Sequence, residues 1–227
     1  MTGSGGYRSM DSVSGPHAGQ PLLTAGAPAL AANAALVACH GRGATAQGGI
    51  NLFDPASRHG VAVFAPQADR SRWFPRPASA SRSANEPWLS SSVDCVAAAL
   101  EAARAIDVPS ERTVLVGFSQ GACVAAEFVR RNPARYGGLA LLSGTLPGTI
   151  DELGSTSIDG SLARTPVLVG YGKADPHVDR AGVAETVRTF ERADAVVDER
   201  CYSDTRHEVT DDEFAAIGTL LEEILND

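Results

Sequence analysis

The sequence predicts a single α/β domain in which a mostly parallel central sheet carries helices on both faces. Short runs of aliphatic and β-branched residues alternate along the chain with segments of helical periodicity, which is the pattern of strands joined by crossover helices. Most of these runs are continuously apolar, as strands covered on both faces are. The length of 227 residues suits one medium-sized domain.

The chain opens with a segment that we predict to be a flexible leader. Residues 1–19 contain nine Gly or Ser residues and no apolar run, so they also lack the hydrophobic centre of a signal peptide. The predicted α/β domain then spans residues 20–227.

Six apolar runs are predicted to be the strands of the sheet. In chain order they cover residues 35–39, 61–65, 113–117, 138–143, 166–171 and 195–202. An earlier extended piece, residues 21–26, is predicted to form an edge hairpin with the first of them.

Helical patterns fill the segments between the runs. Apolar residues recur at helical spacing within 93–103 and within 183–190. Asn132 and Pro133 end the helix that follows residue 119, because a residue before proline disfavours helical geometry. The last helix opens at Thr210 with "TDDE", a capping-box pattern. Its inward stripe is predicted to consist of Phe214, Ile217, Leu221 and Ile224.

Two long loops interrupt this regular alternation, at residues 67–92 and 144–165. Long loops in a compact domain often carry function. Both loops leave the carboxyl ends of predicted strands, where open α/β sheets bind their ligands. We therefore expect the binding site at this edge of the sheet.

Composition and cysteine usage narrow the class of protein. The net charge of −8 argues against a nucleic-acid partner and against docking on anionic membranes. No stretch approaches the ~20 apolar residues of a spanning helix, so membrane insertion is not expected. The four cysteines are scattered without a CxxC pair, which predicts free, mostly buried thiols and a cytoplasmic protein.

The pentapeptide "GFSQG", residues 117–121, stands between a predicted strand and a predicted helix. One interpretation is a nucleophile elbow, in which a strained turn holds Ser119 towards the site and Gly117 and Gly121 relieve crowding. The other is an ordinary strand-to-helix turn. The pentapeptide alone does not decide, so the choice depends on whether the chain supplies partners for the serine.

A base and an orienting acid both follow in the order that α/β-hydrolases use, Ser then Asp then His. His207 comes between the last strand and the last helix, which is the position of the base. Asp175, in the loop after the strand 166–171, is predicted to hold its tautomer, with Asp204 as the reserve. His177 is interpreted as lining the site or as solvated.

Two backbone amides are predicted to form an oxyanion hole. The amide of Gln120 directly follows the nucleophile, and the amide of Arg42 lies in "HGRG" after an early strand. The alternative for "HGRG" is a glycine turn without a ligand. Because four elements fall in matching topological positions, we predict that Ser119, Asp175 and His207 are a catalytic triad.

With these residues in view, the chain resembles the phospholipase/carboxylesterase family, which includes the acyl-protein thioesterases. The resemblance runs from about residue 20 to the end and rests on "HGRG", "GFSQGA", "LSGTLP", "ADPHV" and "RHEVTDDE". It implies an α/β-hydrolase fold and hydrolysis of carboxylic esters or thioesters through an acyl-serine, without metal or organic cofactor. We assign substrate binding to His40, Trp73, Phe74 and Leu146.

Departures from the family pattern favour a small ester as the substrate. The acyl-protein thioesterases carry an apolar residue after "HG", where this chain has Arg42, and no apolar acyl-binding segment follows it. The segment "ANEPWLSSSVD" instead resembles a bacterial branch of small esterases. The leading prediction is therefore a serine carboxylesterase for small or medium esters, and the alternative is an acyl-protein thioesterase or lysophospholipase for long acyl chains.

Four further hypotheses remain open from the sequence. The same triad could transfer the acyl group to an alcohol or thiol, and a hydrolase scaffold could serve as a non-catalytic ligand-binding protein. An apolar edge in 144–165 could support a homodimer. Together with Arg42 of the predicted oxyanion loop, the arginines of the 67–92 loop could make a positive mouth for anionic substrates, or they could be scattered in a solvated loop; the loop arginines are Arg70, Arg72, Arg76 and Arg82.

Overall fold

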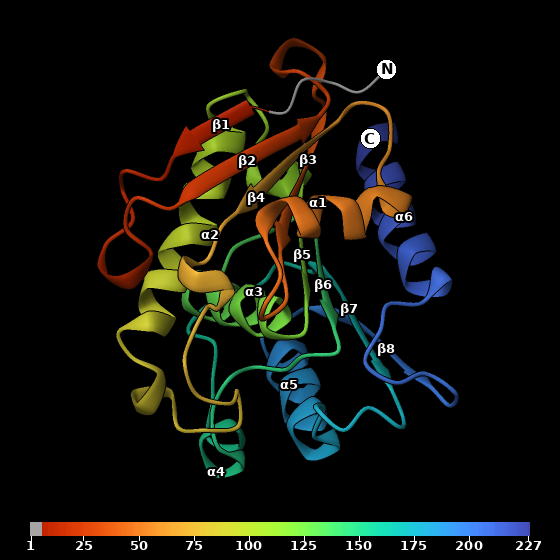
Figure 1. Ribbon diagram of the computed structural model, residues 1–227. Helices are drawn as coiled ribbons and strands as arrows, with labels where there is room; N and C mark the ends of the chain where they lie inside the picture. Colours follow the sequence, from red (N-terminus) through yellow and green to blue (C-terminus); the bar gives the residue numbers. More distant parts are fainter. Residues whose placement is uncertain (1–5) are drawn as a thin grey trace.

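An eight-stranded sheet forms the centre of the computed structural model, which describes residues 6–227 (Figure 1). The strands are β1 Gly6–Ser9, β2 Pro21–Gly26, β3 Ala34–Cys39, β4 Val61–Pro66, β5 Thr113–Phe118, β6 Gly138–Leu142, β7 Pro166–Gly172 and β8 Val196–Tyr202. Each of the six predicted runs lies within one residue of an observed strand at both ends. Continuous apolar runs therefore locate buried strands well.

The strand order is β1-β2-β4-β3-β5-β6-β7-β8. Strands β3 to β8 run parallel, whereas β1 and β2 pair antiparallel at one edge. The predicted mostly parallel sheet is confirmed. The expected hairpin between residues 21–26 and the strand 35–39 is wrong, because β2 pairs with β4 and β1 instead.

Six α-helices cover the sheet. They are α1 Ala46–Phe53, α2 Trp88–Arg104, α3 Gln120–Arg131, α4 Ile150–Gly154, α5 Arg180–Arg192 and α6 Asp211–Asn226. Short 3₁₀ turns lie between the larger elements: η1 Gly15–His17, η2 Ala29–Ala31, η3 Asp54–Ala56, η4 Asp69–Ser71, η5 Arg82–Asn85 and η6 Ser110–Arg112.

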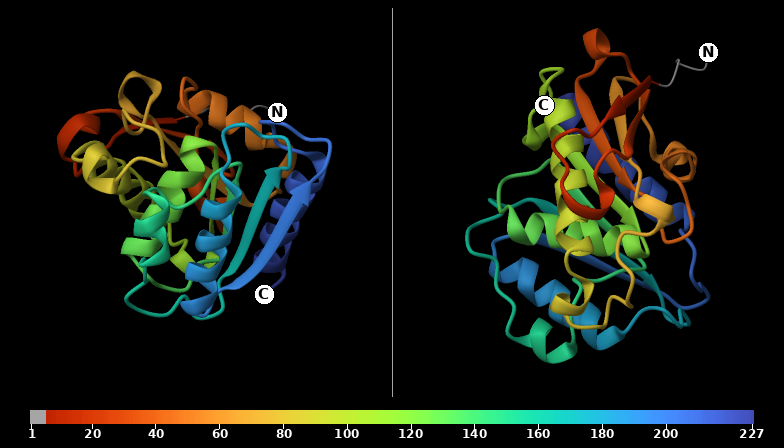
Figure 2. Two further views of the ribbon diagram at one scale, coloured as in Figure 1. Left: turned by 90° about the horizontal axis from the view of Figure 1, so that it is seen from below. Right: turned by 60° about the vertical axis from the view of Figure 1, so that its left-hand side comes forward.

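The helices bury two separate apolar cores, one on each face of the sheet. Side chains of β3 alternate between them: Val37 joins the core under α2, α3 and α5, and Leu36 joins the core under α1 and α6. Figure 2 shows α5 and α6 on opposite sides of β7 and β8. The prediction of helices on both faces is confirmed.

Local capping explains where two of the predicted helices begin and end. Thr210 and Glu213 form the expected capping box at the start of α6. Ile217 and Leu221 are fully buried against the sheet, as the predicted stripe requires. Helix α3 ends at Arg131, directly before Asn132 and Pro133.

The N-terminal segment is ordered where a flexible leader is predicted. Strand β1 pairs with β2, and the side chains of Met10 and Val13 are buried in a core. His17, assigned to the mobile leader, has no exposed surface at all. The prediction of a flexible leader is therefore wrong over residues 6–19. The apolar residues that anchor this segment are too sparse among Gly and Ser to be visible as an apolar run. Residues 1–5 lie outside the described part.

The two predicted long loops contain short elements. Residues 67–92 include η4, η5 and the first turn of α2, and residues 144–165 include α4. Both loops lie at the carboxyl edge of the parallel strands. Because β5, β7 and β8 end at this same edge, the segments that carry Ser119, Asp175 and His207 converge there.

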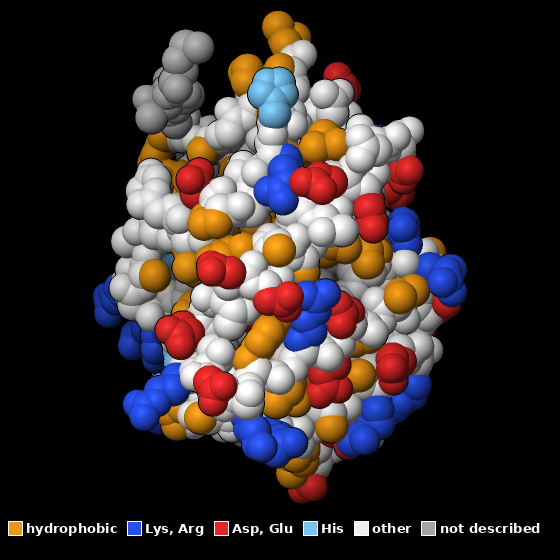
Figure 3. Space-filling view, turned by 90° about the vertical axis from the view of Figure 1, so that its right-hand side faces the viewer, with side chains coloured by type: hydrophobic (Ala, Val, Ile, Leu, Met, Phe, Trp, Pro, Cys, Tyr) orange, Lys and Arg blue, Asp and Glu red, His pale blue; other side chains and the backbone are white. Residues whose placement is uncertain are grey.

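The surface and the thiols complete the description. On the face that carries α6, acidic and basic side chains are mixed, with hydrophobic side chains between them (Figure 3). No helix within residues 6–227 combines the length and apolar character needed to cross a bilayer. All four cysteines are free, with Cys39, Cys95 and Cys123 buried and Cys201 exposed, which confirms the expectation of free, mostly buried thiols.

Candidate active site

Ser119 stands at the sharp turn between β5 and α3. Its backbone adopts φ 56° and ψ −122°, a conformation that side-chain-bearing residues rarely take. Such a conformation costs on the order of 1–3 kcal/mol and persists only where the surroundings impose it. The amide of Ser119 donates to the carbonyl of Leu142 at 2.8 Å, which anchors the turn to β6. The turn therefore has the strained geometry of a nucleophile elbow.

The two glycines of the pentapeptide are required by close backbone contacts. A Cβ atom on Gly117 would overlap the backbone of Gly121 and Ala122. A Cβ atom on Gly121 would overlap the carbonyl oxygens of Cys39 and His40. The predicted reason for these glycines, relief of crowding around the elbow, is confirmed.

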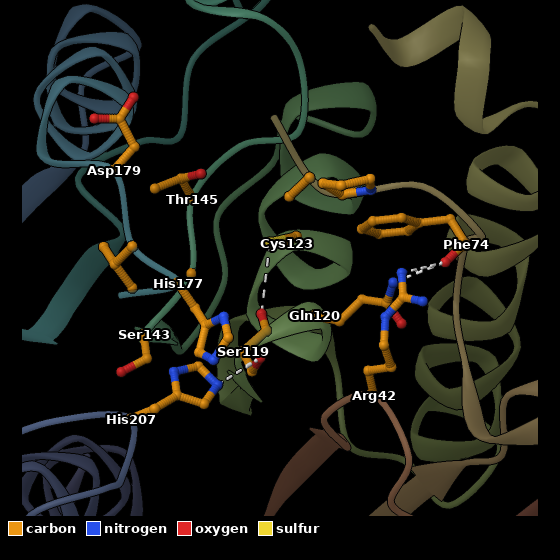
Figure 4. A pocket seen from close by; sticks show the side chains of 14 residues that line it. Arg42, Phe74, Ser119, Gln120, Cys123, Ser143, Thr145, His177, Asp179 and His207 are labelled. Atoms are coloured by element: carbon orange, nitrogen blue, oxygen red, sulfur yellow. Dashed lines mark hydrogen bonds between the residues drawn. The ribbon is translucent and has the colours of Figure 1, made fainter. Parts of the chain in front are cut away.

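The structure brings Ser119, His207 and Asp175 into one hydrogen-bonded chain. Figure 4 shows the part of it that joins His207 to Ser119. The Nδ1 atom of His207 lies 2.7 Å from Oδ2 of Asp175. Its Nε2 atom lies 2.9 Å from Oγ of Ser119. Because the carboxylate accepts the Nδ1 proton, Nε2 is left as the acceptor for the serine hydroxyl.

Both oxygens of Asp175 are hydrogen-bonded and its side chain is fully buried. The second oxygen accepts from the amide of His177 at 2.8 Å, which fixes the carboxylate. The imidazole of His207 packs between the ring of Phe118, with centroids 4.8 Å apart, and the edge of His177 at 4.7 Å. Asp204, the reserve acid, is exposed and forms no hydrogen bond with His207.

The two predicted oxyanion residues flank Ser119, and their side chains brace a neighbouring loop. The side-chain Oε1 of Gln120 accepts a hydrogen bond from the backbone amide of Trp73, and its Nε2 donates to the backbone carbonyl of Phe74, each at 2.9 Å. The guanidinium of Arg42 donates to the Phe74 carbonyl at 2.9 Å and to the Arg76 carbonyl at 3.1 Å.

The backbone amides of these two residues remain available to a ligand. Gln120 is the first residue of α3, where amides have no partner within the helix. Within residues 6–227 no group accepts a hydrogen bond from the Arg42 amide. Together with the helix N-terminus, these amides are suited to a developing negative charge next to Ser119.

A pocket of about 380 Å³ opens over Ser119. Phe74, Pro77, Ala78 and Val178 give it an apolar side, and Figure 4 shows Phe74 and Arg42 across the site from His177 and Asp179. Its size lies within the range of small-molecule sites. His177 lines the pocket, as one of its two predicted interpretations states.

Three of the four predicted substrate contacts lie behind the pocket wall. His40 and Trp73 have no exposed surface, and Leu146 is 1% exposed. The indole Nε1 of Trp73 donates to the backbone carbonyl of His40 at 2.7 Å, and the His40 ring accepts from the Ala68 amide at 3.1 Å, so both side chains support the wall from behind. The prediction that His40, Trp73 and Leu146 contact substrate is therefore wrong, whereas Phe74 lines the pocket.

The arginines of the 67–92 loop do not gather at the pocket. Arg72 lies over the Trp88 ring at 5.2 Å, and Arg82 is bound to Thr156 and close to Glu127. Arg70 and Arg76 are exposed outside the pocket lining. The four loop arginines are therefore scattered, with Arg72 and Arg82 partly buried, whereas Arg42, the fifth arginine of the hypothesis, lines the pocket.

Sequence reasoning missed Ser143 and Cys123 as neighbours of Ser119. Both line the pocket; Ser143 follows β6 in the left-handed region at φ 50°, and its buried Oγ has no partner within the described chain. The Cys123 thiol donates to the Ser119 carbonyl at 3.5 Å. Burial raises the pKa of this thiol to about 11, so it stays protonated and does not compete as a nucleophile.

The residues present offer no obvious metal cage. Within 6–227 there is no group of three or more His, Cys, Asp or Glu side chains arranged around a common point. The chemistry that the arrangement itself supports is acyl transfer through Ser119.

Comparison with known proteins places this site in a family context. The profile of a family described as phospholipase/carboxylesterase matches residues 24–225. A crystal structure of a phospholipase/carboxylesterase from Dyadobacter fermentans superimposes with a TM-score of 0.82 at 32% identity, covering 96% of this chain and 100% of that one. A carboxylesterase from Mesorhizobium loti shares the fold, with a TM-score of 0.71 at 22% identity over 89% of this chain and 94% of that one.

One curated relative matches over a shorter stretch. Acyl-protein thioesterase 1 of Debaryomyces hansenii is 28% identical over 120 residues, which is 52% of this chain and 51% of that protein. The match thus spans about half the length of that relative.

Proposed function

The chain belongs to the phospholipase/carboxylesterase family of α/β-hydrolases, a family of esterases and thioesterases, and we propose that it is a serine carboxylesterase acting on small or medium-sized carboxylic esters. The observation that carries the proposal is the hydrogen-bonded chain from Ser119 through His207 to the buried Asp175. Because a serine hydroxyl is a weak nucleophile near neutral pH, such a chain is what its activation needs.

The reaction proceeds in two halves. Oγ of Ser119 attacks the ester carbonyl while Nε2 of His207 takes its proton, and Asp175 stabilises the imidazolium that forms. The amides of Gln120 and Arg42 receive the negative charge of the tetrahedral intermediate. His207 then gives the proton to the departing alcohol, which leaves an acyl-serine.

Water completes the cycle. His207 takes a proton from a water molecule, whose oxygen attacks the acyl carbonyl and forms a second tetrahedral intermediate. Collapse of this intermediate breaks the bond to Oγ of Ser119 and returns the proton to the serine. The products are one alcohol and one carboxylic acid, and the reaction consumes no co-reactant except water.

The walls of the pocket support a short acyl chain. A second hollow of about 280 Å³ adjoins the pocket, and the residues common to both are Pro77, Ala78, Thr145, His177, Val178 and Asp179. A long acyl chain that continued into this hollow would pass three apolar residues but also His177, the Thr145 hydroxyl and the Asp179 carboxylate, and these polar groups are unfavourable neighbours for methylene groups. A small acyl group avoids this cost.

One observation favours a second candidate, an acyl-protein thioesterase. The half-length match to acyl-protein thioesterase 1 of Debaryomyces hansenii is the observation. The same triad would cleave a thioester by the same steps, with a thiol as the leaving group. Chain-length preference and the ratio of thioester to ester hydrolysis separate the two candidates.

Initial rates on p-nitrophenyl esters from acetyl to palmitoyl test the proposal. We expect activity to peak at short chains and to fall by about 1,000-fold or more in Ser119→Ala, the scale of losing a triad nucleophile. Ser203→Ala is the matched control, because Ser203 is exposed in a turn outside the pocket. A peak at long chains would favour the thioesterase, and a Ser119→Ala variant as active as the wild type would refute the serine mechanism.

The free thiols support a cytoplasmic setting for this enzyme. Buried cysteines such as Cys39 and Cys95 remain unpaired in the fold, as is usual where thiols are kept reduced. Fractionation of cells that produce the full chain, followed by immunodetection, tests the location; recovery outside the cytoplasm would contradict it.

A further inference from the structure

The N-terminal segment, residues 10–20, packs against the loop that walls the pocket. This segment precedes the family match, which begins at residue 24. Met10 and Val13 join the core beneath α2, and the amide of Met10 donates to the carbonyl of Gln20, which closes the segment on itself. His17 projects from this closed segment and is completely buried.

The His17 ring is hydrogen-bonded on both sides to one loop, residues 68–74, which we call the wall loop. Nδ1 accepts from the amide of Asp69 at 3.0 Å. Nε2 lies 2.9 Å from the carbonyl of Trp73 and 3.0 Å from the Ser92 hydroxyl. Because Nδ1 accepts a backbone N–H, the ring is neutral and its single proton is on Nε2, directed to the Trp73 carbonyl.

A second buried histidine holds the preceding amide of the wall loop. Nε2 of His40 accepts from the amide of Ala68 at 3.1 Å, and its Nδ1 lies 2.8 Å from the carbonyl of Gly41. Two consecutive amides, those of Ala68 and Asp69, are therefore bound by imidazoles from different parts of the chain. His40 belongs to the segment that leads into Arg42, whereas His17 comes from the N-terminal segment.

The far end of the wall loop is bonded to both predicted oxyanion residues. The Trp73 amide donates to the Gln120 side chain, and the Phe74 carbonyl accepts from both Gln120 and Arg42. Displacement of the wall loop would therefore shift Phe74 in the pocket and pull on the two residues whose amides flank Ser119.

We propose that His17 is a positioning residue of the active site, which as a neutral imidazole fixes the wall loop and through it Phe74, Gln120 and Arg42. The N-terminal segment is then part of the catalytic apparatus and not only of the sheet edge. The inference rests on the proposed esterase function for its kinetic readout, whereas its spectroscopic readout does not depend on hydrolysis.

Protonation of His17 would break this arrangement. A proton on Nδ1 would face the Asp69 N–H, setting donor against donor. The Trp73 carbonyl and the Asp69 carboxylate favour the charged form of the ring, His40 is its other titratable neighbour, and the indoles of Trp73 and Trp88 pack edge-on against it. Burial is the largest influence and holds the pKa of His17 below its usual range, so the ring is neutral near pH 7.

Three substitutions separate the two hydrogen bonds of His17. His17→Asn can place its carbonyl oxygen near the position of Nδ1 and so keep the hydrogen bond from the Asp69 amide. His17→Gln can instead keep the donor towards the Trp73 carbonyl. His17→Leu removes both hydrogen bonds. We expect kcat to fall by about 10-fold or more in His17→Leu with KM changed less, because sub-ångström misplacement of catalytic groups is costly. At least one amide variant should recover part of the rate.

His59→Gln is the matched control, because His59 is exposed in a turn away from the pocket. Rates are referred to the folded fraction, determined from urea unfolding curves of each variant. If all three His17 variants match the wild-type kcat per folded molecule, or if the amide variants recover nothing over His17→Leu, the positioning role is refuted and the ring is only a packing element.

Intrinsic fluorescence gives a second test that needs no substrate. The chain has two tryptophans, Trp73 and Trp88, and the His17 ring lies edge-on to both, at 5.7 and 5.4 Å between centroids. An imidazolium quenches a neighbouring indole, so lowering the pH from about 8 to about 5 should quench the fluorescence of the wild type in a step that depends on His17.

We expect His17→Gln to lack the His17 part of this step and to retain only the part due to His40, which stacks on Trp73 at 4.9 Å. An unchanged step in His17→Gln would overturn the inference. A wild type without esterase activity would count against the proposed function alone, since the fluorescence step and its change in His17→Gln do not depend on hydrolysis.

Discussion

Two carbonyl oxygens determine which residue can stand at position 121. Gly121, the second residue of α3, lies directly against the end of β3, and any Cβ atom there would overlap the carbonyls of Cys39 and His40. Cys39 and His40 lead into the predicted oxyanion loop, so displaced carbonyls would move that loop as well. A single methyl group at this position therefore acts on folding and on the site together.

We predict that Gly121→Ala lowers the free energy of unfolding by about 1–3 kcal/mol, the usual cost of overpacking, and lowers kcat/KM by about 100-fold. Gly154→Ala is the matched control, because a Cβ on Gly154 would meet nothing within 4 Å. Urea unfolding and ester hydrolysis measure the two effects. A Gly121→Ala variant as stable and active as Gly154→Ala would show that the close backbone contact is not real.

At the scale of single residues, the sequence revealed the site where local constraints define it. Ser119 stands between two obligatory glycines, and His207 and Asp175 follow in chain order at strand ends, so their convergence could be predicted from topology. His17 could not be predicted in this way. Its burial depends on Trp73, Trp88 and Asp69, which are more than fifty residues away along the chain.

At the scale of elements, a buried carboxylate joins α3 to the loop before α2. Glu127 has no exposed surface and lies 2.7 Å from both Arg130 and Arg131, one turn along the same helix. Arg131 also reaches Glu86 at 3.0 Å, and Arg82 approaches Glu127 at 3.8 Å. Helix α3 therefore holds the outer part of the 67–92 loop through charge.

Glu127→Gln should destabilise the fold by about 3–5 kcal/mol, because it leaves clustered guanidinium groups without their shared buried partner. The matched control is Glu101→Gln in α2, whose pair with Arg104 is also three residues apart but exposed, and we expect a change within about 0.5 kcal/mol there. Urea unfolding of both variants measures the difference. Equal midpoints would mean that the Glu127 cluster contributes no more than a surface pair.

Strands were easier to predict than the start of α2 for a physical reason. A strand covered on both faces must be apolar throughout, and that property is visible in the sequence. The first turn of α2 instead contains buried polar residues: Ser91 donates to the Ser14 carbonyl and Ser92 to the Trp73 carbonyl. Their partners come from distant segments, so local composition suggested a loop where the chain forms a helix.

At the scale of the whole molecule, buried titratable groups limit stability at both ends of the pH range. Burial lowers the pKa of His17 and His40 from 6.5, so the unfolded chain binds protons that the folded protein does not. Their contribution to stability is full above pH 6.5 and is lost as the pH falls from there towards the folded pKa values.

The thiols act in the opposite direction. Burial raises the pKa of Cys39 from 9.0 to about 12 and that of Cys123 to about 11, and it raises the pKa of Cys95 as well. Below pH 9.0 these thiols are protonated in both states. Above it the unfolded chain loses protons first, so stability falls as the pH rises towards the folded pKa values.

We therefore predict that the urea midpoint is highest between pH 6.5 and 9.0 and declines on either side. His17→Gln, although less stable at its optimum, should show a shallower acid decline, because one of the two buried imidazoles is gone. Cys201→Ser should leave the alkaline decline unchanged, since that thiol is exposed. A midpoint that keeps rising as the pH falls below 6.5 would mean that the imidazoles accept protons inside the fold, and the wall loop would then need a hydrogen-bonding arrangement other than two neutral histidines on consecutive amides.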